Sequence, residues 1–232
     1  FENNDGVFTE KTLSDNPFGA ISNSSYFTNP ILVDINSDNK MDFIDSKSCC
    51  GSNRINFYQN DGQGNMVLSN TLIFDSLKTI VSSPSITALD FDGDDDLDLI
   101  SGQQHGGYLL YENVNNTYYE KSGMENIYSG FDAGTSSSPT FYDVNNDGFE
   151  DLITGTSDGN VKYFENNGAN RFYETKDHPF SHILVDGGYA TPVFIDLDDD
   201  QDMDLIIGCG SATIKYFRNE NGIFNEQFNS NN

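Results

Sequence analysis

The sequence predicts an all-β protein, a β-propeller of four-stranded antiparallel blades and most simply of four blades. Three observations carry this prediction. An acidic motif of nine residues recurs four times at nearly even spacing, the apolar runs between turns are short, and no run leaves room for a helix of ten residues. Four short strands in a repeat of roughly 40–50 residues are typical of a propeller blade. Because one blade cannot bury both of its faces, the repeats are expected to pack as a single array.

The strands of each unit are expected in a fixed order around the acidic motif. The first strands are 30–34, 86–90, 139–143 and 192–196, and the second strands are 41–44, 97–100, 151–154 and 203–207. The third strands, 57–60, 110–113, 163–166 and 216–219, end on an asparagine that recurs at intervals of 53 residues. The fourth strands are 66–68, 118–120, 172–174 and 224–226. Recurrent phenylalanine and tyrosine residues are expected to pack between the blades.

The acidic motif has the ligand spacing of a calcium loop. Its first aspartates are 56, 53 and 53 residues apart, and each copy carries side-chain oxygens at positions one, three, five and nine. The seventh residue is expected to contribute its backbone carbonyl, as in helix-loop-helix calcium sites. The candidate metal ligands are Asp34, Asn36, Asp38, Lys40 and Asp42; Asp90, Asp92, Asp94, Asp96 and Asp98; Asp143, Asn145, Asp147, Phe149 and Asp151; and Asp196, Asp198, Asp200, Asp202 and Asp204.

Calcium is the ion that these loops predict, at four ions for the chain. Calcium accepts six to eight oxygen ligands in irregular geometry, whereas magnesium demands a stricter octahedron and transition metals prefer His or Cys, which no loop contains. Position six requires a sharp turn, which Gly148 provides, Asn39 and Asp95 tolerate, and Gln201 fits less comfortably. The alternative, solvated polar turns without a cation, would leave several like charges crowded together.

Composition narrows the possible partners. The chain has 232 residues with 11 basic and 37 acidic side chains, a net charge of −26. Nucleic acids and anionic membranes are bound through basic patches, so neither is expected as a partner, and no run of about 18 apolar residues predicts membrane insertion. Three cysteines, Cys49, Cys50 and Cys209, leave two alternatives open, unpaired thiols or one bridge from Cys209. Glycosylation sequons at Asn23 and Asn115 give weak support for an extracellular location.

The repeated pattern resembles a known family. Pro-x-φ-x-Asp-x-Asp-x-Asp-Gly-x-x-Asp-Leu-φ-x-Gly (φ for an apolar residue), followed by Tyr-Phe-x-Asn, is similar to the FG-GAP or VCBS repeats of extracellular β-propellers, including integrin α-subunit heads, over nearly the whole chain. The resemblance implies calcium in the hairpin between the first two strands of each blade, with partner-binding loops on the opposite face. The departures are Asn36 and Asn145 at position three, the missing glycine at position six in three copies, and Ile86 in place of the leading proline.

One β-propeller domain, residues 1–232, is expected. Its units are about 17–70, 71–124, 125–178 and 179–232. Residues 1–16 duplicate the outer-strand segment 217–232, so one copy of that strand exceeds what a four-bladed ring needs. Three explanations stay open: a piece of a larger propeller, a four-bladed domain in a tandem chain, or a strand that completes a blade of the next subunit. A self-contained four-bladed domain is the preferred expectation.

The leading functional hypothesis is a non-catalytic, calcium-stabilised binding, adhesion or structural module at the cell surface or outside the cell. Its partner would be a protein or glycan on the face opposite the calcium loops, where Tyr26, His105 and Tyr189 are the first side chains to test. The alternative is a subunit of an extracellular filament or surface assembly, in which neighbouring copies join by terminal strand addition. A polysaccharide-active enzyme or a lectin domain is less favoured, because the three histidines, His105, His178 and His182, fit no catalytic order.

Overall fold

The protein is built of strands throughout the part of the chain that the structure describes. This computed structural model describes residues 2–4, 7–11, 16–18, 21, 27–49, 52–69, 85–168 and 171–228. A single 3₁₀ turn at Gly123–Glu125 is the exception to β structure among these residues. The strands are β1 Glu2–Asn4, β2 Val7–Thr9, β3 Phe27–Val33, β4 Asp42–Cys49, β5 Ser52–Asn60, β6 Met66–Ser69, β7 Ser85–Leu89, β8 Asp98–Gly102, β9 Tyr108–Asn113, β10 Tyr118–Lys121, β11 Ser138–Tyr142, β12 Asp151–Gly155, β13 Val161–Asn166, β14 Phe172–Thr175, β15 Thr191–Ile195, β16 Asp204–Gly208, β17 Ile214–Glu220 and β18 Ile223–Glu226.

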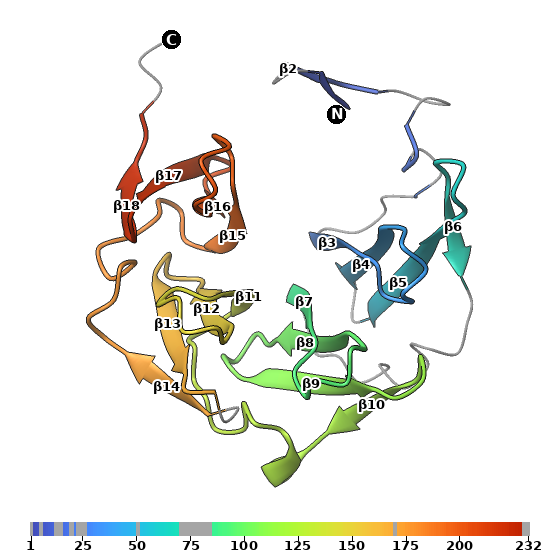
Figure 1. Ribbon diagram of the computed structural model, residues 1–232, viewed down its shortest axis with the longest axis horizontal. Helices are drawn as coiled ribbons and strands as arrows, with labels where there is room; N and C mark the ends of the chain where they lie inside the picture. The colour runs from blue at the N-terminus through green and yellow to red at the C-terminus, as the bar shows by residue number, and fades with distance from the viewer. Residues whose placement is uncertain are drawn as a thin grey trace.

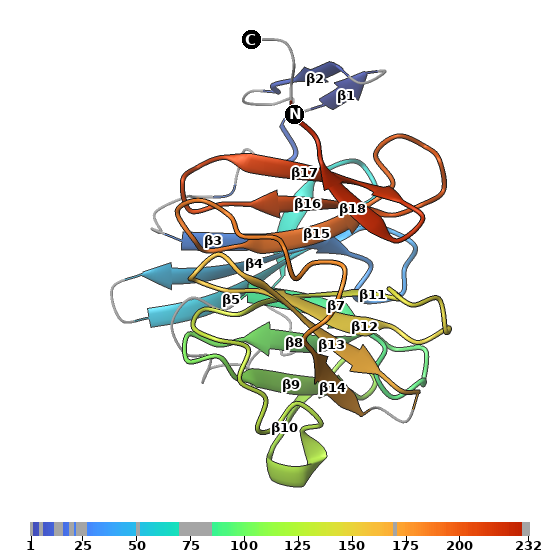
Figure 2. The ribbon, with the colours of Figure 1, turned by 90° about the vertical axis from the view of Figure 1, so that its left-hand side faces the viewer.

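Sixteen of these strands form four antiparallel blades of four strands each, so the predicted β-propeller fold is confirmed (Figure 1). The blades are β3–β6, β7–β10, β11–β14 and β15–β18, and within each the strands pair in chain order. The first strands of successive blades, β3, β7, β11 and β15, contact one another near the centre. Around the centre the blades follow one another in sequence order in Figure 1, and Figure 2 shows them from the side.

The second strand of a blade is the most deeply buried one. All five residues of β8 and all five of β12 are buried, because these strands have a neighbouring blade on each face. This placement accounts for the adjacent Leu and Ile residues in each strand, since a strand covered on both faces need not alternate polar and apolar residues. The acidic residue that begins each of them, Asp98 or Asp151, is buried with them.

Three apolar clusters fill the spaces between the blades, as the aromatic pattern predicts. The first lies between blades one and two and contains Ile44, Phe57, Leu99 and Tyr111. The second contains Ile100, Leu110, Tyr128, Leu152, Phe164 and Phe172, and the third contains Ile153, Tyr163, Phe180, Leu205, Phe217 and Phe224. Each cluster takes residues from two blades, so the blades stabilise one another by burying apolar surface.

Backbone hydrogen bonds join blade two to three and blade three to four. In each case, backbone carbonyls in the turn after the second strand of one blade accept hydrogen bonds from the segment that leads into the next blade. Ala133 N–H donates to the Gly106 carbonyl and Val185 N–H donates to the Gly159 carbonyl, each at 2.9 Å. Gly159 has a φ of +88°, and a Cβ there would lie 2.4 Å from the Val185 carbonyl oxygen. Glycine is therefore required where the two blades approach.

The first blade differs from the others in length. Asn60 follows Asp42 by 18 positions in the first blade, whereas Asn113 follows Asp98 by 15 positions in the second. The three extra residues lengthen the hairpin of β4 and β5, which therefore extends to Cys49 and Ser52, beyond the predicted boundary at residue 44.

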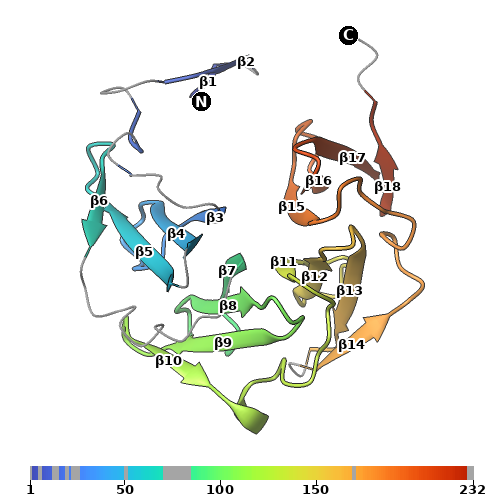
Figure 3. The same cartoon turned by 180° about the vertical axis from the view of Figure 1, so that it is seen from behind.

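The duplicated N-terminal sequence also duplicates a pairing register. β1 and β2 form a separate hairpin in which Glu2 pairs with Thr9 and Asn3 with Phe8. The corresponding residues of the fourth blade pair in the same way, Arg218 with Asn225 and Asn219 with Phe224. The hairpin lies beside the space between the first and fourth blades (Figure 3).

The first and fourth blades are the two ends of the series. Among the strands that the structure describes, β3 and β15 have no contact comparable to those between successive inner strands, and they face each other across an open space in Figure 1. On the side of β15 away from the third blade, Val193 is 52% exposed and Ile195 is 42% exposed. The corresponding residues of β11, Thr140 and Tyr142, are only partly exposed, because the fourth blade covers them.

Candidate metal centre

Each acidic loop connects the first and second strands of a blade, the position that the sequence predicts. The first aspartate stabilises the loop, because both of its carboxylate oxygens accept hydrogen bonds from backbone N–H groups. In the third loop, Asp143 Oδ1 accepts from Asp147 N–H at 3.1 Å and Oδ2 accepts from Gly148 N–H at 2.8 Å. The first aspartates of the other three loops, Asp34, Asp90 and Asp196, accept from the corresponding N–H groups.

The loop backbone turns sharply at two positions. Position six is left-handed in all four loops, with φ of +63° at Asn39, +70° at Asp95, +90° at Gly148 and +74° at Gln201. The sequence predicts this turn, and Gln201 adopts it despite lacking the freedom of glycine or asparagine. Position four is also left-handed, at Ser37, Gly93, Asn146 and Asp199, a turn that was not predicted from the sequence. These two turns direct the alternating carboxylates toward one side of the loop.

The ninth aspartate is buried and anchors the loop to the blade. Asp42, Asp98, Asp151 and Asp204 are all 0% exposed. In the third blade Asp151 Oδ1 accepts from Asn166 N–H at 2.8 Å, and Oδ2 accepts from Val144 N–H at 3.1 Å and from the Tyr163 hydroxyl at 2.9 Å.

The recurrent asparagine closes the end of each loop. Asn166 Nδ2 donates to the Glu150 carbonyl at 3.0 Å, and its Oδ1 accepts from Gly168 N–H at 3.0 Å. The equivalent side chains Asn60, Asn113 and Asn219 donate to the carbonyls of Met41, Leu97 and Met203. The interval of 53 residues therefore reflects a repeated structural contact between the third strand and the acidic loop.

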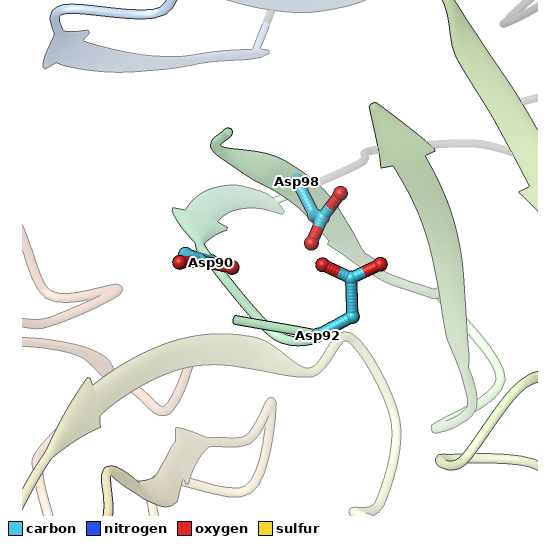
Figure 4. A group of neighbouring side chains, drawn as sticks. All are labelled: Asp90, Asp92 and Asp98. Atoms are coloured by element: carbon cyan, nitrogen blue, oxygen red, sulfur yellow. The ribbon is translucent and has the colours of Figure 1, made fainter. Parts of the chain in front are cut away.

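Carboxylates converge in two of the loops. One oxygen from each of Asp90, Asp92 and Asp98 lies within 4.8 Å of the others, and Figure 4 shows the Asp92 and Asp98 carboxylates pointing toward each other. Asp196, Asp198 and Asp200 form a second group by the same measure. The first and third loops have Asn36 and Asn145 at position three, so amide oxygens stand there in place of a third carboxylate.

The donor set fits a hard divalent cation. It consists of oxygens alone, and oxygen ligands are those that calcium prefers. Asp42 supplies a second indication: its Oδ2 is buried and has no hydrogen-bond partner among the described residues. A buried carboxylate oxygen without a partner is costly, and a cation beside it would remove that cost. The acidic loops can therefore hold metal ions.

Burial raises the pKa of Asp42, Asp98 and Asp151. The pKa of Asp98 rises to about 7, chiefly because burial penalises its charged form, and the nearby Asp92 and Asp94 carboxylates add to the effect. Burial likewise raises the pKa of Asp42 and of Asp151. A bound divalent cation would oppose these shifts by favouring the ionised form.

Basic side chains reach two of the loops. The Arg218 guanidinium lies 2.8 Å from Asp198 and 3.3 Å from Asp200, and Lys40 Nζ lies 3.3 Å from Asp38. Arg218 was not among the predicted site residues, although it occupies the variable position of Tyr-Phe-x-Asn. Gln59 stands at the same position in the first blade, and its Nε2 lies 3.5 Å from Asp38 Oδ2. A side chain at this position is thus placed to reach the acidic loop.

The candidate ligand-binding residues lie at the opposite end of the blades. Exposed His105 is in the turn between β8 and β9, and Tyr189, 60% exposed, precedes β15. Tyr189 N–H donates to the Ser157 carbonyl at 3.2 Å, so it belongs to the junction between blades three and four. Tyr26 lies outside the described residues.

Cysteine and sequon expectations have mixed outcomes. Cys209 is a free thiol, so the alternative of a bridge from this residue is not what the structure shows. Asn115 is exposed in the turn between β9 and β10, whereas Asn23 and Cys50 are outside the described residues. No helix within the described part of the chain has the length and apolar character needed to cross a membrane.

The fold and the loops define a β-propeller with an acidic hairpin loop repeated in every blade. The profile of the FG-GAP-like repeat matches residues 90–154 and 143–207, which together span slightly more than half of the chain. The chain belongs to the FG-GAP-like repeat family, as its motif predicts.

Among solved structures, the chain is similar to a lectin from Agrocybe aegerita that recognises non-reducing terminal N-acetylglucosamine. The identity is 18%, the TM-score is 0.42, and the alignment covers 86% of this chain and 50% of the lectin chain. The chain thus spans about half the length of that protein. No curated protein matches the chain.

Proposed function

We propose that the chain is a calcium-stabilised, non-catalytic binding or adhesion module that works outside the cell. An FG-GAP-like propeller fits a binding or structural module. The observation that carries the calcium assignment is the convergence of Asp90, Asp92 and Asp98, within 4.8 Å, at a loop position that recurs in all four blades. The ion would be held by the oxygens at positions one, three, five, seven and nine of each loop.

Calcium in this position would stabilise the blade. The ninth aspartate connects the loop to the third strand through the backbone of the recurrent asparagine, as Asp151 does with Asn166. An ion that fixes this aspartate would fix the hairpin of the first two strands against the third. A bound calcium ion supplies positive charge that offsets the repulsion among the carboxylates. The opposite end of the blades would then present its turns on a rigid support to a protein or glycan partner.

A second candidate function has its own supporting observation. β1 and β2 pair in the register of β17 and β18, so the N-terminal hairpin carries the sequence and pairing of an outer blade segment. The alternative proposal is an extracellular filament or surface assembly in which this segment completes a blade of a neighbouring copy. Deletion of residues 1–16 should then convert assemblies to monomers, whereas a chain that is monomeric at all concentrations would contradict this alternative.

Thermal unfolding with and without calcium tests the main proposal. Addition of a chelator should lower the melting temperature by many degrees, because four loops lose their cations together, and excess calcium should restore it. Asp90→Asn should reduce the calcium-dependent shift, and Asp186→Asn, an exposed acidic residue outside the loops, should leave it unchanged. An identical melting temperature in chelator and in calcium would refute the assignment.

A further inference from the structure

Each of the first three blades turns an apolar face toward the blade that follows it in the chain. We call this surface the forward face of a blade. In the third blade it consists of Thr140, Tyr142, Val144, Ile153, Val161 and Tyr163, of which all but Thr140 belong to the cluster shared with the fourth blade. In the first blade it consists of Ile31, Val33, Ile35, Ile44, Ile55 and Phe57, which belong to the cluster shared with the second blade. Burial against the next blade leaves Ile44 and Ile153 0% exposed.

The forward face of the fourth blade is equally apolar. Strand pairing and loop position identify its residues as Val193, Ile195, Leu197, Ile206, Ile214 and Tyr216. Val193 pairs with Ile206 and Ile206 pairs with Tyr216, so the face is continuous across three strands. All six positions therefore carry apolar side chains of the kind that pack between blades elsewhere in the chain.

This face is uncovered, unlike its equivalents in the other blades. Ile214 is 77% exposed, whereas Val161 at the same position of the third blade is 4% exposed. Val193, Ile195 and Leu197 are between 42% and 52% exposed. A continuous apolar face left open to solvent is typical of a surface that binds another protein.

The other side of each blade receives the forward face of the blade before it. In the fourth blade, the ring of Phe194 stacks on Tyr142 of the third blade, with centroids 4.6 Å apart and an interplanar angle of 26°. Leu32 is the equivalent of Phe194 in the first blade, since it pairs with Phe43 as Phe194 pairs with Leu205. Leu32 is 55% exposed, so the receiving side of the first blade also presents an open apolar residue.

We propose that the forward face of the fourth blade binds the receiving side of the first blade in a second copy of this chain. The contact would continue the interface that joins each successive pair of blades within the chain, with Leu32 of the second copy against Ile195 as Phe194 lies against Tyr142. It is a heterologous, head-to-tail contact. It differs from the terminal strand addition considered above, because it buries sheet faces and uses no residue of segment 1–16.

Analytical ultracentrifugation of the full chain over a range of concentrations tests this proposal. The buffer contains calcium and an ionic strength of about 0.15 M, because the net charge of −26 opposes self-association when it is not screened. The average mass should rise with concentration from that of the 25.8 kDa chain to at least that of a dimer. A mass that stays at 25.8 kDa at every concentration would overturn the proposal.

Substitutions on the forward face identify the surface that associates. Ile214→Asp should weaken association at least about tenfold, because it removes an apolar side chain from the contact and places a charge there, and Val193→Asp should act in the same way. Both residues are exposed, so the melting temperature should not change. Met124→Asp makes the same change in charge at a fully exposed residue of the 3₁₀ turn and should leave association intact. Association of Ile214→Asp as tight as that of the unmodified chain would contradict the assignment.

Mixing two variants tests the head-to-tail arrangement. Leu32→Asp should also weaken association at least about tenfold, whereas a symmetric contact between two fourth blades would leave it unchanged and would refute the proposal. A mixture of Ile214→Asp and Leu32→Asp chains should recover a dimer, because the first variant keeps its receiving side and the second keeps its forward face. Deletion of residues 1–16 should preserve the association. Its loss on this deletion would show that terminal strand addition, and not contact between blade faces, joins the copies.

Discussion

The recurrent asparagine offers a direct test of how the loops are attached to the blades, through Asn166→Ala. This side chain makes two hydrogen bonds, to the Glu150 carbonyl and from Gly168 N–H, both at 3.0 Å, and is 7% exposed. A typical hydrogen bond contributes about 1 kcal/mol net, and the exposed surroundings of Glu150 and Gly168 allow water to replace each lost partner. The substitution should therefore lower the free energy of unfolding by about 2 kcal/mol, or the melting temperature by roughly 4–8 °C.

Chemical denaturation in calcium buffer measures this change, with Asn225→Ala as the matched control. Asn225 is an exposed asparagine on the outer strand β18, so its removal should change the free energy of unfolding by less than about 0.5 kcal/mol. If Asn166→Ala changed the free energy of unfolding as little as the control does, the asparagine would not stabilise the loop, and the interval of 53 residues would need another explanation.

Three further predictions concern the blade junctions, the buried carboxylates and the basic residue at the fourth loop. Gly155→Ala should destabilise the protein by about 1–3 kcal/mol in denaturant unfolding, because the added Cβ would lie 2.1 Å from the Ala190 carbonyl oxygen. The control Gly107→Ala should be tolerated, because no atom lies within 4 Å of its added Cβ. Equal stability of the two variants would contradict the close approach of the two blades at Gly155. Because the pKa of Asp98 in the folded protein is raised to about 7, the native state binds this proton more tightly than the unfolded chain. The calcium-free protein should accordingly lose stability as pH rises from 3.8 to about 7, and calcium should reduce this loss; a melting temperature in chelator that rises over that interval would show the sign to be wrong. Arg218→Gln should strengthen calcium binding at the fourth loop by about threefold in calorimetry, since calcium would no longer compete with the guanidinium near Asp198, and weaker binding would imply that Arg218 supports the site.

Most of the fold was predictable because each structural requirement recurs in the sequence. The second strands could be located from the adjacent apolar residues that follow the ninth aspartate of each motif, and both β8 and β12 are fully buried. The third strands could be located from an asparagine whose side chain has the same role in every blade. The long hairpin of the first blade was not predicted, since the extra residues between Asp42 and Asn60 are polar and carry no strand signal of their own.

The positions of the acidic loops were predictable from the sequence, and the residues around them were less so. Alternating aspartates identify the loops, but the partnership of Arg218 with Asp198 depends on how β17 lies beside the loop, which no local pattern reveals.

Counting the calcium ions bound by the intact chain tests the central claim most directly. Native mass spectrometry after exchange into calcium should show four specifically bound ions, one for each acidic loop, and Asp90→Asn should weaken one of them selectively. A chain that retains no calcium under these conditions, or one in which Asp90→Asn changes no bound ion, would contradict the assignment of the four repeated loops as calcium sites.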